Sequence, residues 1–162
     1  MVNFPISTPW KVVIYRCALV FITLFWIAHM ISLPVAVTYD GFIYIDMADV
    51  LGSSRFPQDW NFARTPLFPL TLKLAFWAFG RQPLAVIAVS STLGLAGTFI
   101  VGRLVRRYAG EVAAALAMVV MALFPTSVAY QHFALTEVGT AFFLVLIAAA
   151  LLLPADRPRQ VW

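Results

Sequence analysis

Charged residues are scarce in this sequence. Only 11% of its 162 residues are Asp, Glu, Lys or Arg, whereas 62% are hydrophobic, and the mean hydropathy is +0.90. Soluble globular domains carry about 25% charged residues. The composition therefore argues against an ordinary soluble domain and predicts an integral membrane protein.

Cysteine is also rare, because Cys17 is the only one in the chain. A single cysteine excludes an internal disulfide bond. The chain lacks repeats, low-complexity tracts and linkers, which predicts one membrane domain over residues 1–162. The net charge of the chain is +4. In membrane proteins such a positive charge usually comes from arginines in the cytoplasmic loops, so it gives no reason to expect a nucleic-acid partner.

The long apolar runs predict an all-α polytopic fold with four transmembrane helices. A helix rises 1.5 Å per residue and must cross a hydrocarbon core of about 30 Å. This places the spans at about residues 12–34, 83–103, 111–131 and 137–153. The first run is longer than the apolar core of a signal peptide, about 7–15 residues, so we interpret it as an uncleaved anchor.

Residues 35–82 form a large, charged loop between the first two spans. Its patterns predict a helix on the membrane surface at about residues 41–51 and an interfacial or re-entrant helix at about residues 65–80. The second of these is apolar but contains two prolines and Lys73. If it does not span, the basic turn at 102–110 shares a side with the N-terminus, as the positive-inside rule favours. The N-terminus is then cytoplasmic and the loop extracytoplasmic.

Small residues recur at every fourth position of the predicted span 83–103, at Ser90, Gly94, Thr98 and Gly102. Such a stripe lets neighbouring helices approach closely. The pattern predicts helix packing and no chemistry.

The predicted topology brings two acidic regions to the same outer face. One is the loop containing Asp40 and Arg64, and the other is the turn before the last span, which contains Glu137. A carboxylate can take a proton from an attacking hydroxyl or amine, and a second one can hold a divalent cation against a phosphate. An arginine can donate two parallel hydrogen bonds to a phosphate.

Each candidate also has a purely structural interpretation. Asp40 could cap the helix that follows it, and Glu137 could be a first-turn acid favoured by the helix dipole. Arg64 and Tyr44 could anchor the loop at the level of the lipid headgroups. Asp46 could belong to a solvated helix face.

Several motifs occur in a defined order along the chain. Asp-x-x-x-Tyr starts at Asp40, Arg-Thr-Pro-Leu-Phe-Pro-Leu starts at Arg64, an aromatic helix ends at Gly80, and Leu-Thr-Glu ends at Glu137. This order resembles the N-terminal part of GT-C fold glycosyltransferases, in particular the bacterial branch related to protein O-mannosyltransferases and the lipid A aminoarabinose transferase.

The resemblance implies a large first extracytoplasmic loop with juxtamembrane helices, in a bacterial plasma membrane. It also implies transfer of a sugar from a polyprenyl-phosphate carrier to an extracytoplasmic acceptor. Family members have more spans, so this chain is expected to be a truncated product, a fragment, or one part of a split enzyme whose partner protein supplies further helices.

The resemblance also assigns roles to individual residues. Asp40 matches the catalytic carboxylate, Tyr44 and Asp46 match its companion positions, Arg64 lies where the family contacts the donor phosphate, and Glu137 matches an acid linked to phosphate or metal binding. Many relatives carry a second acid at the position of Gly41.

Two other function classes remain open from the sequence. A non-enzymatic membrane subunit could pack through the small-residue stripe of residues 83–103. A transporter fragment would need ionisable residues in the middle of a span, and none is evident.

Overall fold

The computed structural model of the chain describes residues 8–32, 38–124, 129 and 136–152. Within these ranges the regular secondary structure is all helix and contains no strand, so the all-α prediction is confirmed for them. The helices are α1 (Pro9–Ser32), α2 (Tyr39–Val50), α3 (Leu67–Phe79), α4 (Pro83–Leu123) and α6 (Thr136–Leu152). Two of them, α1 and α4, are long and apolar enough to cross a membrane.

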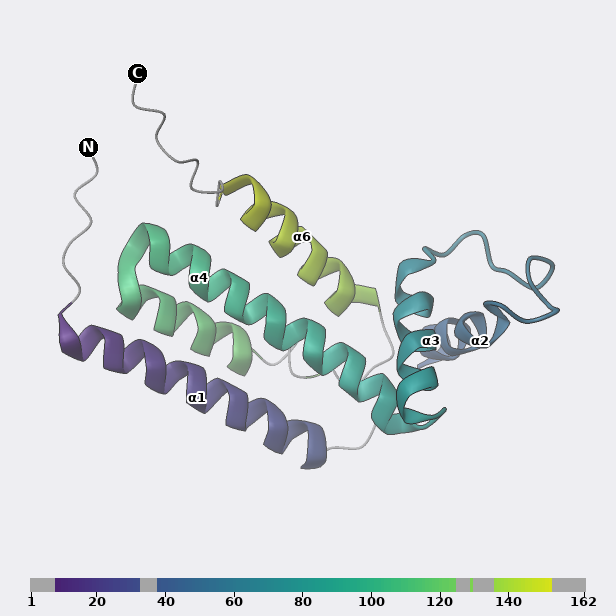
Figure 1. Cartoon of the computed structure of the whole chain (residues 1–162), viewed down its shortest axis with the longest axis horizontal. Helices are drawn as coiled ribbons and strands as arrows, with labels where there is room; N and C mark the ends of the chain where they lie inside the picture. The colour runs from purple at the N-terminus through teal and green to yellow at the C-terminus, as the bar shows by residue number, and fades with distance from the viewer. Residues whose placement is uncertain (1–7, 33–37, 125–128, 130–135, 153–162) are drawn as a thin grey trace, which may run out of the picture.

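Helix α4 is a hairpin of two antiparallel arms that reverses direction at Gly110 (Figure 1). Gly110 has φ 84° and ψ 179°, a backbone conformation that residues with a Cβ rarely adopt. The prediction of a basic turn over residues 102–110 was wrong in its extent, because the helix continues to Ala109. The reversal needs only the glycine.

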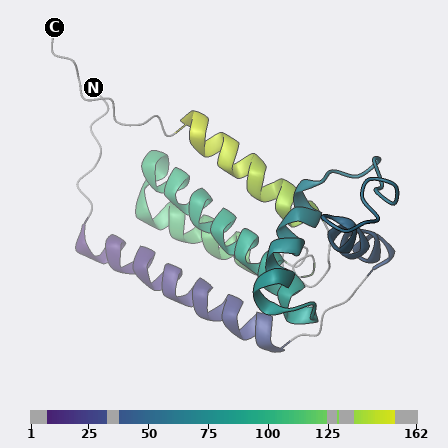
Figure 2. The same cartoon turned by 45° about the vertical axis from the view of Figure 1, so that its right-hand side comes forward.

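The two arms of α4 form an elongated bundle with α1 and α6 (Figures 1 and 2). One end of this bundle contains the Gly110 reversal and the start of α1, where the guanidinium of Arg106 lies 4.8 Å from the ring of Tyr15. The end of α6 also lies there, because the Tyr108 hydroxyl donates a hydrogen bond to the carbonyl of Leu152. We call this the hairpin end.

Helices α2 and α3 gather at the opposite end of the bundle, which we call the loop end (Figures 1 and 2). They correspond to the predicted surface helices at 41–51 and 65–80. Helix α3 has 13 residues and is therefore about 20 Å long, too short to cross a bilayer core. It packs on both α2 and α4.

The bundle helices differ slightly from the predicted spans. Helix α1 starts three residues before the predicted span 12–34, and the first arm of α4 extends beyond the predicted span 83–103. The second arm is helical to Leu123, while most of the rest of the span predicted at 111–131 lies outside the described residues. Helix α6 matches the predicted span 137–153 within one residue at its start; residue 153 is outside the described part.

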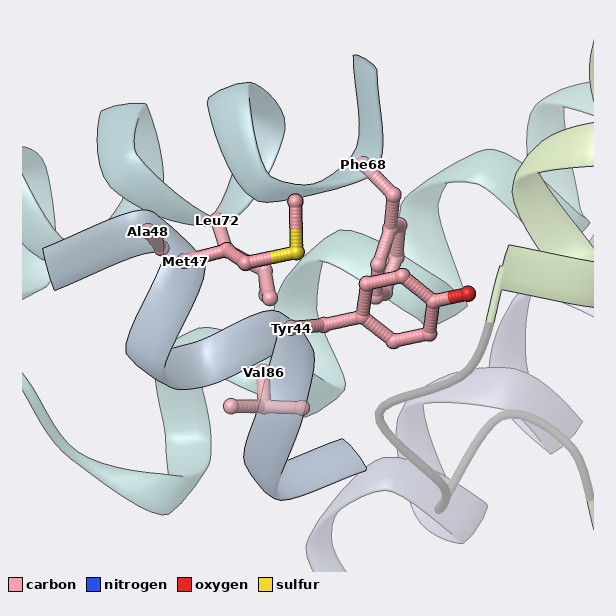
Figure 3. Close-up of a cluster of buried hydrophobic side chains, with 6 residues drawn as sticks. All are labelled: Tyr44, Met47, Ala48, Phe68, Leu72 and Val86. Atoms are coloured by element: carbon pink, nitrogen blue, oxygen red, sulfur yellow. The ribbon is translucent and has the colours of Figure 1, made fainter. Parts of the chain in front are cut away.

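A buried apolar cluster holds α2, α3 and the start of α4 together (Figure 3). Its members are Tyr44, Met47, Ala48, Phe68, Leu72 and Val86. All are at most 4% exposed. This cluster fixes the loop end on the bundle.

The small-residue stripe packs inside the chain. Ser90 and Thr98 are almost fully buried. The α-carbon of Gly94 faces the indole ring of Trp26 on α1, and Gly102 faces the side chain of Met118 on the second arm of α4. The predicted role in packing therefore holds, and the partners of the stripe are helices of the same chain.

Candidate functional site

Thr38, not Asp40, caps helix α2. The backbone of Thr38 is extended, and its hydroxyl accepts a hydrogen bond of 3.1 Å from the amide of Gly41. This is the usual geometry of an N-cap threonine. The side chain of Asp40, in the first turn, is therefore not needed for capping.

Asp40 forms an ion pair with Arg64, which lies 24 residues further along the chain. Nη2 of the arginine donates a hydrogen bond of 2.5 Å to Oδ1 of the aspartate. The side chains are 46% and 34% exposed, so the pair lies at the surface where a second molecule can reach it.

Tyr44 joins this ion pair from one helical turn further along α2. Its ring is buried and packs edge-on against Phe68, with the ring centroids 5.6 Å apart. Its hydroxyl points out of the apolar cluster toward the start of α6 (Figure 3). Nη1 of Arg64 lies 3.4 Å from this hydroxyl, a long and weak hydrogen bond.

Arg64 remains positively charged at physiological pH. The side chains of Tyr44 and then Asp40 raise the pKa of Arg64 above its ordinary value, because both favour the charged guanidinium. A guanidinium has five N–H donors. Asp40 and Tyr44 each engage one of these, which leaves donors for an incoming anion.

The start of α6 completes the arrangement. The hydroxyl of Thr136 lies 3.4 Å from the hydroxyl of Tyr44. Glu137 follows directly and is exposed, with no ion pair to any residue that the structure describes. We call Asp40, Tyr44, Arg64 and Thr136 the polar cluster; it unites three of the predicted site residues, and Glu137 borders it in sequence.

An apolar groove of about 240 Å³ begins beside the polar cluster. Thr65 and Thr136 line it next to the cluster, and its walls come from the start of α3, from Leu93 on α4 and from α6. Further lining residues on α6 are Gly139, Thr140, Phe143, Leu144 and Ile147. A charged group and an apolar channel thus lie next to each other.

Asp46, a predicted companion of Asp40, lies outside the polar cluster. Its side chain is 62% exposed and pairs with Arg55 at 3.2 Å. Asp49 pairs with Arg81 at 2.8 Å. These exposed pairs connect α2 to the following loop and to the start of α4, and each is expected to add little stability.

The described residues contain no dense cluster of metal-ligating side chains. No group of three or more His, Cys, Asp or Glu side chains among them is arranged to hold an ion. The one carboxylate of the polar cluster, that of Asp40, forms an ion pair with Arg64. A divalent cation held by Asp40 and Glu137 stays a prediction, because Mg²⁺ is commonly bound by one or two carboxylates together with water and substrate phosphates.

Sequence reasoning did not single out Thr136 or Thr38. The position of Thr38 two residues before Asp40, at the end of an apolar run, is a usable N-cap signal. Thr136 carries no comparable signal, because its contact with Tyr44 joins residues 92 positions apart.

Comparisons of the chain with protein family models, with curated proteins and with solved structures gave no match.

Proposed function

We propose that this chain is the N-terminal module of a membrane glycosyltransferase that uses a polyprenyl-phosphate sugar donor. The observation that carries the proposal is the polar cluster. It joins a carboxylate, a guanidinium and a phenol from two separate motifs and places them beside an apolar groove. A lipid-linked phosphate has the matching combination of charge and hydrocarbon.

The proposal includes four membrane spans, with the loop end on the extracytoplasmic side. Helix α1 supports a lipid environment because it exposes large apolar side chains around much of its surface, among them Val13, Val20, Phe21, Leu24 and Ile31. Soluble monomers rarely expose apolar patches of this extent. The arginine-rich hairpin end is then cytoplasmic, as the positive-inside rule expects.

Cysteine labelling tests this topology. In a Cys17→Ser background, a cysteine is introduced either at Ser54 in the loop or at Ala109 beside the reversal, both of which are exposed. In right-side-out vesicles, a membrane-impermeant maleimide is expected to label Ser54→Cys at once and Ala109→Cys only after permeabilisation. Labelling of both from the same side would contradict the proposed spans.

In the proposed reaction, Arg64 holds the donor phosphate and Asp40 acts on the acceptor. The acceptor hydroxyl or amine attacks C1 of the sugar, and the bond between C1 and the phosphate oxygen breaks. The phosphate leaves with the electron pair, and the proton of the acceptor passes to Asp40. Direct displacement of this kind inverts the configuration at C1.

The groove beside the cluster would hold the first part of the carrier chain. Its volume of about 240 Å³ lies below the usual range of ligand pockets, about 300–1,000 Å³. It therefore suits a short stretch of isoprenoid next to the phosphate. The remaining chain would extend into lipid or onto helices of a partner protein.

Binding of a polyprenyl phosphate to the purified chain tests the role of Arg64. Replacing Arg64 by Gln is expected to weaken binding about tenfold, because it removes a charge-assisted donor to the phosphate. Arg55→Gln is the matched control, because Arg55 lies in the same loop but pairs with Asp46 and Asp59 outside the cluster. Equal affinities of wild type, Arg64→Gln and Arg55→Gln in a fluorescence titration would reject the donor site.

The alternative function is a scaffold that packs on a partner through the small-residue stripe, but this stripe is already covered by the chain itself. Gly94 and Gly102 already face side chains of the same chain, and Ser90 and Thr98 are buried. A partner protein would have to bind elsewhere. This favours the enzyme module over that form of scaffold.

A further inference from the structure

A second groove lies between α1 and the first arm of α4, toward the hairpin end. Its volume is about 790 Å³, within the usual range for ligand pockets. Its body is lined by apolar side chains, including Leu19, Val20 and Leu24 on α1 and Phe99 on α4. Arg103 and Arg106 also line it. The groove therefore combines hydrocarbon walls with two positive charges.

The two arginines are in different states. Arg106 stacks on the ring of Tyr15 at 4.8 Å and lies 3.5 Å from a carboxylate oxygen of Glu111. Arg103 is exposed and has no hydrogen bond or ion pair with any residue in the described part of the chain. They are three residues apart and so occupy one face of the helix. Among the described residues, Glu111 is the one carboxylate that pairs with either arginine. The net charge of the site is therefore positive, which favours a bound anion.

The apolar walls and the two arginines of the groove together restrict the kind of ligand that it can bind. A free phosphate ion would use the arginines and leave the apolar walls exposed. A lipid with no net charge would cover the walls without neutralising Arg103. An anionic phospholipid satisfies both parts, since basic pockets between membrane helices bind such headgroups.

We propose that this groove binds one anionic phospholipid. Arg103 and Arg106 hold its phosphate, and an acyl chain lies along Val20 and Leu24 of α1. The site is at the opposite end of the bundle from the polar cluster. It would bridge α1 and α4 and hold a structural lipid of the leaflet at the hairpin end, whether or not the polar cluster binds a sugar donor.

Lipid binding by the purified full chain in a neutral detergent tests the headgroup site. Native mass spectrometry would compare phosphatidylglycerol with phosphatidylcholine. We expect the wild-type chain to bind phosphatidylglycerol at least about tenfold more tightly than phosphatidylcholine. In the Arg103→Gln and Arg106→Gln variants, the affinity for phosphatidylglycerol should fall about three- to tenfold. Arg107→Gln is the matched control, because Arg107 is an exposed neighbour that does not line the groove.

Three outcomes would overturn the proposal, the third from a parallel titration with inorganic phosphate. Equal binding of the two lipids would show that charge does not select the ligand. An equal loss in all three arginine variants would indicate general attraction to a basic surface instead of a defined site. Inorganic phosphate binding as tightly as phosphatidylglycerol would show that the apolar walls contribute nothing.

A pair of tryptophan substitutions tests the acyl-chain part. Val20 lines the groove and is 60% exposed, whereas Val13 on the same helix is 56% exposed and does not line it. Val20→Trp should fill the groove and weaken phosphatidylglycerol binding about tenfold, and Val13→Trp should leave it within about twofold. Thermal unfolding of both variants would confirm that they fold, and equal affinities would reject this position of the chain.

Discussion

Replacing Asp40 by Asn is expected to lower the rate of sugar transfer about 100- to 10,000-fold, the usual contribution of a general base. Asparagine keeps the size of the side chain and an oxygen that can accept from Arg64, but it cannot take the proton of the acceptor. The measurement is transfer from a radiolabelled polyprenyl-phosphate sugar. Under the proposed function, the assay uses this chain together with the further helices that a partner protein or the rest of the enzyme would supply.

Asp49→Asn is the control for this experiment. Asp49 lies on the same helix and also pairs with an arginine, Arg81, but it is outside the polar cluster. We expect its transfer rate to stay within about twofold of wild type, since exposed ion pairs contribute little. Transfer by Asp40→Asn at the wild-type rate would remove Asp40 from the mechanism. Polyprenyl phosphate binding by the same variant checks that the site is still formed.

Replacing Gly94 by Ala is expected to destabilise the fold by about 1–3 kcal/mol, the usual cost of overpacking a core. A Cβ at this position would meet the ring of Trp26 at a distance that real Cβ atoms do not reach. Trp26 is only 4% exposed and belongs to the cluster that joins α1 to the second arm of α4. Because the ring is packed in this cluster, moving it away from an added Cβ would disturb the contacts between α1 and α4.

Gly97→Ala gives the matched control on the same helix. Gly97 is buried, and a Cβ there would lie 3.9 Å from Phe142, an ordinary contact. Alanine is favoured over glycine in a helix by about 0.5–1 kcal/mol, so this variant should be as stable as wild type or slightly more so. Thermal unfolding in detergent would compare the two. If both variants unfold at the same temperature, the tight contact between Gly94 and Trp26 is not present.

The sequence predicts the helices of this chain better than their ends. Scarce charge and long apolar runs are sufficient for the all-helical class, and Lys73 with two prolines separates α3 from the bundle helices. The position of the reversal in α4 is harder to predict from the sequence. Arg103, Arg106 and Arg107 suggested a basic loop, but arginine is a good helix former and the helix continues until Gly110.

The candidate site could be predicted only in part. The spacing of Asp40 and Tyr44 places them on one face of a helix, so their proximity follows from the sequence. The position of Arg64 depends on a loop of irregular structure, and periodicity does not specify its path. Asp46 was predicted to accompany Asp40, but it lies on another side of α2. There it binds Arg55, nine residues further along the chain.

The contact between Tyr44 and Thr136 has a consequence for biosynthesis. The ribosome makes the two residues 92 positions apart, and α6 also forms much of the wall of the apolar groove. In the proposed topology, the pair of Asp40 and Arg64 can form as soon as the loop has been translocated. The groove beside it needs α6 and therefore forms only after α6 has been inserted. A nascent chain would therefore form the ion pair early and the apolar groove late.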